Sequence, residues 1–188
     1  EIIVQKVFRN IMDGLQDTLK LLDYAAIERA ALLIRSARRI AVYGFGNSAT
    51  VCRDIETRFL RFGMVVQAYS DAHQQATSAS LLTGKDVVIA VSHTGATLEL
   101  LDTVRTARAA GAAVIIITSH VHSPLAKLGD IVLHGMGREV HYSSEAVSSR
   151  LIHMAITDAL YTAIAMQSPK DYRRNLQKMR AVIAKKRT

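Results

Sequence analysis

The sequence predicts an α/β fold, a three-layer αβα sandwich built around a five-stranded parallel sheet. Short apolar runs alternate with helix-like segments, and the runs occupy residues 40–45, 64–69, 86–92, 112–119 and, more weakly, 130–134. The clearest runs are rich in Val and Ile without polar alternation, as expected of strands buried on both faces. Glycines follow the helix-like segments 48–62, 72–82 and 97–110, and glycine commonly ends helices. This alternation indicates βαβ units with helices on both faces of the sheet.

Helices are predicted on both sides of this core. Residues 1–36 carry apolar side chains at three- and four-residue steps and are expected to form packing helices. A long helix over about 144–166 is apolar around most of its circumference, so we expect it to be buried, partly by another subunit. We therefore describe the chain as one domain, with N-terminal helices (1–36), an α/β core (37–167) and a basic C-terminal helix (168–188).

The composition is that of an ordinary globular protein. Of 188 residues, 49% are hydrophobic and 21% are charged. No apolar run approaches the roughly 18 residues of a membrane span, and no secretion signal opens the chain, so we expect no membrane partner. Since Cys52 is the single cysteine, an internal disulfide is excluded and a cytoplasmic location is the simplest expectation.

The net charge of +8 is concentrated in the C-terminal segment. Residues 170–188 contain eight basic residues and one acidic residue, which leaves the rest of the chain close to neutral. A neutral body excludes a basic nucleic-acid groove. The tail has two interpretations: a solvated amphipathic helix with Leu176, Met179 and Ile183 packing inward, or a supplementary contact to DNA.

The first of three polar turns at predicted strand ends is YGFGNSATV. Gly44 and Gly46 allow close backbone approach, and Ser48 lies at the start of the next helix. The turn also matches the dinucleotide pattern G-x-G-x-x-G/A, with Asp71 after the second strand as a ribose-binding acid. A tight strand–helix turn capped by Ser48 is the structural alternative.

The second turn is VVIAVSHTGATLEL, which brings Ser92, Thr94 and Thr97 to the start of a helix. The free amides around Gly95, together with three hydroxyls, would form a small anion site at the positive end of that helix. The absence of a lysine after the glycine excludes a nucleotide P-loop.

The third turn opens the last long helix and contains Glu145, which can accept a hydrogen bond from a sugar hydroxyl, act as a base, or complement the helix dipole. His134, His141 and Arg150 are nearby candidates, and His73 follows the second strand. The histidines lack the spacing of metal ligands, so we expect no metal and no cofactor.

The three turns, in this order, resemble the sugar isomerase (SIS) domain over about residues 20–167. That family has a G-x-G-x-S turn after the first strand and an S-x-S/T-G-x-T turn after the third, which here are Gly44–Ser48 and Ser92–Thr97. The segments SHTGATLELLDTVRTARAAGA, ITSHVHSPLAKLGD and SSEAVSSRLIHMAITDALYTAI are most similar to the effector domain of RpiR-type transcription regulators.

This resemblance implies a flavodoxin-like fold and a site for a phosphorylated sugar. It assigns the phosphate to Ser48, Ser92, Thr94 and Thr97, places His93 and Gly95 in the same turn, and gives Glu145 to the sugar. Further candidates for ligand contacts are Gly46, Asn47, His73 and Arg150. It also implies a DNA-binding helix-turn-helix domain before Glu1, and a homodimer or tetramer. A phosphosugar isomerase or lyase with Glu145 as base is the alternative, and a nicotinamide-binding domain is the third.

Overall fold

A computed structural model describes residues 2–137 and 147–185. Its centre is a sheet of five parallel strands, β1 (Ile40–Tyr43), β2 (Val66–Tyr69), β3 (Val87–Ser92), β4 (Ala113–Thr118) and β5 (Ile131–His134), in the order β2-β1-β3-β4-β5. The predicted fold class is confirmed. From β1 the chain adds β2 on one side and β3 on the other, so the strand order reverses between β1 and β3.

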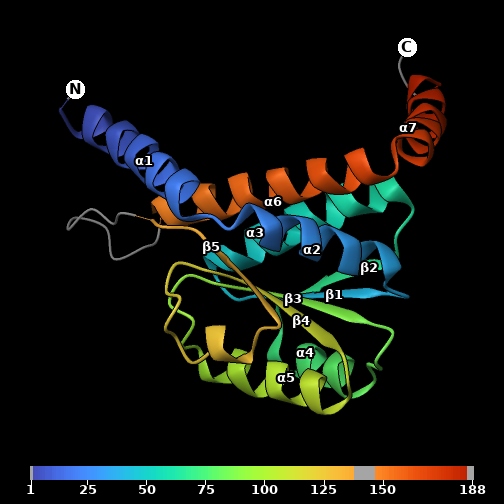
Figure 1. The fold of residues 1–188 in the computed structure, drawn as a ribbon, viewed down its shortest axis with the longest axis horizontal. Helices are drawn as coiled ribbons and strands as arrows, with labels where there is room; N and C mark the ends of the chain where they lie inside the picture. Colours follow the sequence, from blue (N-terminus) through green and yellow to red (C-terminus); the bar gives the residue numbers. More distant parts are fainter. Residues whose placement is uncertain (1, 138–146, 186–188) are drawn as a thin grey trace.

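Helices cover both faces of the sheet (Figure 1). On one face lie α2 (Tyr24–Ser36), α3 (Asn47–Phe59) and α6 (Val147–Gln167), and on the other lie α4 (Ala72–Ser80) and α5 (Leu98–Ala109). Alternate residues of β3 point to opposite layers: Ile89 packs with the first group and Val88 with the second. Because both faces are covered, β3 and nearly all of β4 are continuous buried apolar runs, as the sequence predicted.

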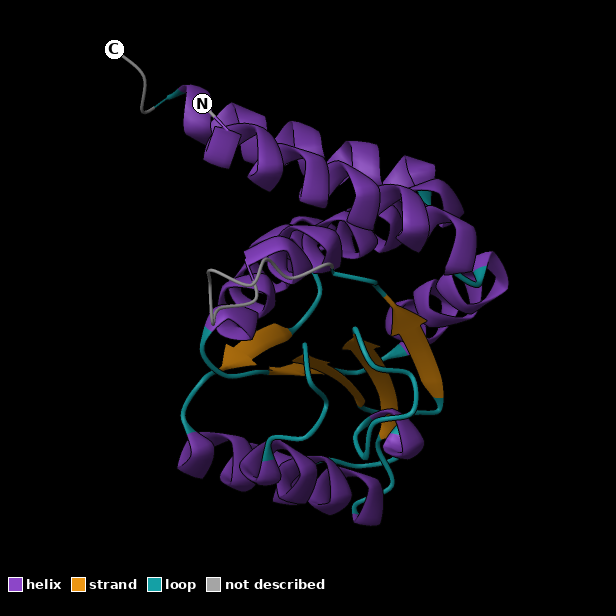
Figure 2. Cartoon of the chain, turned by 90° about the vertical axis from the view of Figure 1, so that its left-hand side faces the viewer, coloured by secondary structure: helices purple, strands orange, loops and turns teal. Residues whose placement is uncertain are grey.

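Two helices extend from the ends of this core (Figures 1 and 2). The helix α1 (Ile2–Leu21) packs on α6 along Gly14 and Thr18, and the Thr18 hydroxyl accepts a hydrogen bond from the amide of Met136 at 2.9 Å. The helix α7 (Pro169–Ala184) packs on the short 3-10 helix η1 (Leu60–Phe62), where Asn175 Nδ2 donates to the carbonyl of Phe62 at 2.9 Å.

The burial of β2, α6 and α7 is uneven, and one packing expectation, for α7, needs correction. β2 is an edge strand whose side chains are half-buried or exposed, because no strand covers its outer edge within the described residues. On α6 the side chains of Leu151 and Met166 are exposed in the single chain, and the expectation that another subunit covers part of this helix stays a prediction. In α7, Ile183 is exposed and does not pack inward, whereas Leu176 and Met179 are half-buried.

The helix α1 also differs from a fully packed helix. Its apolar side chains Val4, Phe8, Met12, Leu15 and Leu19 form an exposed stripe beside the face that contacts α6. The sequence predicted the amphipathic helix correctly, but only part of its apolar face is covered. Within the described ranges, no helix combines the length and the apolar character that crossing a membrane requires.

Candidate functional site

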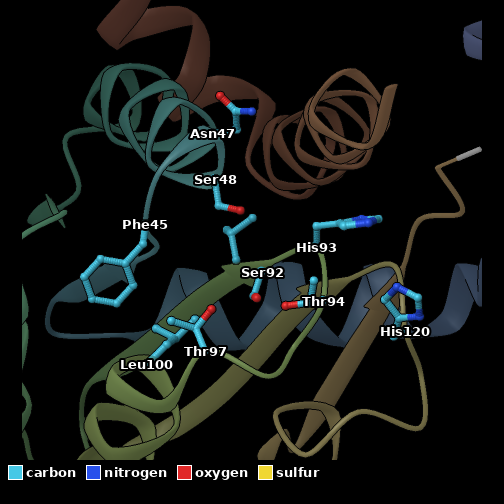
Figure 3. A pocket seen from close by; sticks show the side chains of 10 residues that line it. Phe45, Asn47, Ser48, Ser92, His93, Thr94, Thr97, Leu100 and His120 are labelled. Atoms are coloured by element: carbon cyan, nitrogen blue, oxygen red, sulfur yellow. The ribbon is translucent and has the colours of Figure 1, made fainter. Parts of the chain in front are cut away.

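A pocket of about 440 Å³ opens at the carboxyl ends of β1 and β3, where the strand order reverses. This is the position at which open α/β sheets bind ligands. Figure 3 shows the side chains around it. The described residues that line it come from the first two predicted turns and from the loop after β4: Phe45, Asn47, Ser48, Val91, Ser92, His93, Thr94, Thr97, Leu100 and His120.

The first turn brings Ser48 to the pocket. Gly46 has φ 53°, a left-handed conformation that favours glycine, and occupies the N-cap position of α3. The Ser48 amide donates to the carbonyl of Phe45 at 3.0 Å, which closes the turn. Within the described part of the chain, α3 has no side-chain cap, so the alternative in which Ser48 caps this helix is wrong and its hydroxyl is presented to the pocket.

The buried side chain of Gln75 contacts the backbone on which this turn begins. Its Nε2 donates to the carbonyl of Tyr69 at 2.9 Å and lies 3.4 Å from the carbonyl of Gly44. The amide therefore ties the end of β2 to the end of β1. Sequence analysis gave Gln75 no role, since a glutamine in a helical segment has no pattern that separates it from surface glutamines.

The second turn is organised by Gly95, which is buried with φ 64°. Its amide donates to the Ser92 hydroxyl at 3.0 Å, and the Ala96 amide donates to the Thr94 hydroxyl at 3.4 Å. Thr97 occupies the N-cap of α5, yet within the described residues its hydroxyl makes no cap hydrogen bond. The side-chain oxygens of Ser92, Thr94 and Thr97 turn toward one another in Figure 3, with Ser48 facing them from α3.

The loop after β4 holds the second turn in place. The amide of Ser119 and the hydroxyl of Thr118 both donate to the carbonyl of His93, at 3.2 Å and 3.3 Å. Further along, the amide of Leu125 donates to the carbonyl of Gly95 at 3.0 Å. The turn is thus fixed by a neighbouring loop at two points, which preorganises its donors.

Four histidines gather beside the pocket. The rings of His93 and His120 make an edge contact with centroids 5.2 Å apart. Behind them, His153 Nε2 of α6 lies 3.1 Å from the Ser119 hydroxyl, and His134 Nε2 lies 3.1 Å from the Ser119 carbonyl. Burial, reinforced by the nearby His93 and His134, lowers the pKa of His153 to about 3, so this imidazole is neutral at physiological pH.

The predicted site residues fall into three groups. Ser48, Ser92, His93, Thr94 and Thr97 line the pocket together with Asn47, while Gly46 and Gly95 supply the backbone of its two turns. His73, which is exposed on α4, and Arg150, on α6, are not among the described lining residues. Glu145 and His141 lie outside the described residues.

His120 and Phe45 line the pocket although sequence analysis assigned neither. The signal for His120 was its position directly after the fourth strand, in ITSH, which corresponds to that of the polar residues after the third strand. Asp71, the ribose-binding candidate, instead caps α4 by accepting from the amide of Gln74 at 2.9 Å. The helix cap accounts for this acid without a dinucleotide.

The chemistry of the pocket suits an oxyanion. The described lining residues contribute hydroxyls and imidazoles but no carboxylate, lysine or arginine. Asn47 and Ser48 at the start of α3 and Thr97 at the start of α5 also line it, and helix N-termini favour anions. Among the described residues, no cluster of three or more His, Cys, Asp or Glu side chains is arranged to hold a metal ion.

Comparisons with known proteins identify the family of the chain. The SIS domain family matches residues 33–163. The HTH-type transcriptional regulator RpiR of Escherichia coli (strain K12) is 34% identical over 181 residues, which cover 96% of this chain and 61% of the relative. The bifunctional protein glk of Paraburkholderia xenovorans (strain LB400) is 39% identical over 162 residues, which cover 86% of this chain and 25% of that protein.

A solved structure also aligns over nearly the whole chain. The Vibrio vulnificus NanR protein complexed with ManNAc-6P superimposes with a TM-score of 0.91 at 27% identity, covering 99% of this chain and 70% of that one. The chain therefore spans about three fifths of the length of the RpiR relative and about seven tenths of NanR.

Proposed function

The chain belongs to the SIS domain family, and from this premise we propose that its pocket binds a phosphorylated sugar as the effector-sensing domain of an RpiR-type regulator of carbohydrate metabolism. One observation carries the proposal. Ser48 and Thr94, from turns far apart in the sequence, line the same pocket together with the hydroxyls of Ser92 and Thr97. Uncharged donors converging at a helix N-terminus are suited to a phosphate group.

The phosphate occupies the space between the two turns. Hydroxyls of Ser48, Ser92, Thr94 and Thr97 donate to its oxygens, and free amides at the start of α5 complete the shell. The sugar extends toward Asn47 and His93, and Glu145 accepts from a sugar hydroxyl. A volume of about 440 Å³ lies within the range of small-molecule sites and accommodates a hexose phosphate.

The regulator assignment is supported by the relatives. RpiR is named an HTH-type transcriptional regulator, and NanR was solved with ManNAc-6P. In the full protein, residues 1–188 would form one SIS domain, and a helix-turn-helix domain before them would contact DNA. Ligand binding would order the two turns and shift the geometry of a homodimer or tetramer in the cytoplasm.

The binding part is tested by calorimetry with a panel of hexose and amino-sugar phosphates that includes N-acetylmannosamine 6-phosphate. At least one member is expected to bind with a 1:1 stoichiometry, and the corresponding unphosphorylated sugar is expected to bind far more weakly. If the folded protein binds none of the panel, the sensor proposal fails.

A phosphosugar isomerase or lyase is the second candidate. The observation that favours it is the pair of imidazoles in the pocket, since proton transfer at a sugar carbon needs an acid–base group beside the ligand. Glu145 is the base in this alternative. Turnover of an aldose or ketose phosphate by the purified protein, lost in Glu145→Gln, would favour this function over sensing alone.

A further inference from the structure

The pocket proposed for phosphate has an unusual charge composition. Of the described residues that line it, only His93 and His120 have ionisable side chains. A phosphate monoester carries nearly two negative charges at neutral pH. Hydroxyls and amides donate hydrogen bonds to such a group without neutralising it. Within the described lining, any full positive charge must therefore come from an imidazole.

The two imidazoles are held together by the backbone. His93 is in the turn after β3 and His120 in the loop after β4, and the bond from the Ser119 amide to the His93 carbonyl joins the two segments. Their centroids are 5.2 Å apart with an interplanar angle of 65°. Both rings lie on the same side of the pocket in Figure 3. His120 is exposed to solvent.

Two further imidazoles face the pair from neighbouring elements. From α6, His153 faces them as a buried neutral imidazole, and at the end of β5 His134 lies 3.1 Å from the carbonyl of Ser119. The helices α3 and α5 contribute Asn47, Ser48, Thr97 and Leu100 to the lining, none of which titrates near neutral pH.

We propose that His93 and His120 bind the doubly charged oxyanion as a pair that takes up one proton from solvent, which makes His120 a further binding residue. One proton is expected rather than two, because like charges at this separation repel. The inference rests on the proposed function of the pocket as a phosphate site. It predicts that affinity for a dianion falls as pH rises, by at most about tenfold per pH unit for one proton.

Inorganic sulfate is the probe that tests this, because it remains a dianion throughout the experiment and any pH dependence belongs to the protein. Sulfate is titrated at constant ionic strength at about pH 6 and about pH 8, and binding is followed by the backbone amide NMR signals of Gly95 and Thr97. The wild type is expected to bind at least about tenfold more tightly at the lower pH. His122→Asn, an exposed histidine of the same loop outside the described lining, is the matched control and should behave as the wild type.

His93→Asn and His120→Asn are each expected to reduce the pH dependence, and the double variant is expected to bind sulfate equally at both pH values. Sulfate binding that is independent of pH in the wild type, or a pH dependence that persists in the double variant, overturns the inference while leaving the phosphate site intact. If sulfate leaves the Gly95 and Thr97 signals unmoved at about pH 6, the inference is also overturned, and the sugar-phosphate panel separately decides the proposed function.

Discussion

Gly95 lies against Ser123 so closely that a Cβ atom on Gly95 would come within 2.2 Å of the Ser123 hydroxyl oxygen and 2.6 Å of the Ser123 Cβ. Gly95 also has φ 64°, a conformation that side-chain-bearing residues rarely adopt. Two independent constraints therefore require glycine at the centre of the second turn. The turn that presents Ser92, Thr94 and Thr97 therefore depends on a glycine at position 95.

Gly95→Ala is expected to destabilise the protein by about 3 kcal/mol, combining the cost of the left-handed conformation with overpacking against Ser123. Affinity for a sugar phosphate should fall as well, because the turn must move. Urea unfolding and calorimetry measure the two effects. In a double-mutant cycle, Ser123→Gly should recover the steric part and leave the conformational part. Additive effects of the two substitutions would show that the contact with Ser123 carries no cost.

Ser92 and Thr97 are expected to respond differently to loss of their hydroxyls. The Ser92 hydroxyl accepts from the Gly95 amide, whereas within the described chain the Thr97 hydroxyl makes no cap bond. Thr97→Val should weaken sugar-phosphate binding about tenfold or more with little change in unfolding free energy, since a bond to a charged group is lost. Ser92→Ala should weaken binding and also lower stability by about 1 kcal/mol. Equal effects of both substitutions on stability would contradict this separation.

The exposed apolar stripe of α1 should take part in self-association. Phe8, of which 63% is exposed, and Leu19, of which 61% is exposed, belong to a stripe that continues toward an apolar groove lined by Leu15, Ala155 and Ala159. Phe8→Glu is expected to weaken the oligomer at least about tenfold, because it buries a charge in an apolar contact. Sedimentation velocity over a concentration series measures this. Arg9→Glu, at the neighbouring exposed position on the charged face, should leave the oligomer unchanged. If Arg9→Glu weakens the oligomer as much as Phe8→Glu does, the apolar stripe is not the interface.

The sheet and the two turns were predictable from the sequence because they rest on local patterns. Val- and Ile-rich runs identify strands that helices cover on both faces, and Gly46 and Gly95 mark backbone that only glycine adopts readily. Parallel strands bring their carboxyl ends to one edge, so Ser48 and Thr94 were expected to meet. Local sequence patterns do not determine the order of strands across a sheet, so β2 was not predicted to be an edge strand.

The histidine side of the pocket was not predictable in the same way. His120 reaches the pocket because the Ser119 backbone pairs with His93, a contact between loops that no periodicity encodes. His153 is part of an apolar helical pattern, and nothing in that pattern shows that its ring meets the Ser119 hydroxyl. The same limit applies to α1, where the spacing of apolar residues predicts a covered face but does not say what covers it.

His153 should make the stability of the protein depend on pH. Burial lowers its pKa in the folded state to about 3, against about 6.5 when unfolded, so the unfolded state binds the proton first. The stabilisation is complete above about pH 6.5 and is lost progressively as pH falls toward about 3, by up to about 1.4 kcal/mol per pH unit. Because of this group, the free energy of unfolding measured in urea should be about 2 kcal/mol higher at about pH 7.5 than at about pH 5.

His153→Gln isolates the contribution of His153 to the pH dependence of stability, because the glutamine amide can still bond to the Ser119 hydroxyl but does not titrate. Its stability should change less between the two pH values than that of the wild type, whereas His122→Gln, at an exposed position, should retain the wild-type difference. Asp86 does not interfere in this window: burial raises its pKa, but hydrogen bonds from Arg38 and Thr83 outweigh that effect and lower it to about 2. Its stabilisation is present above about pH 4 and is lost only as pH falls toward 2. A His153→Gln variant with the full wild-type pH dependence would therefore mean that another group takes up the proton on unfolding.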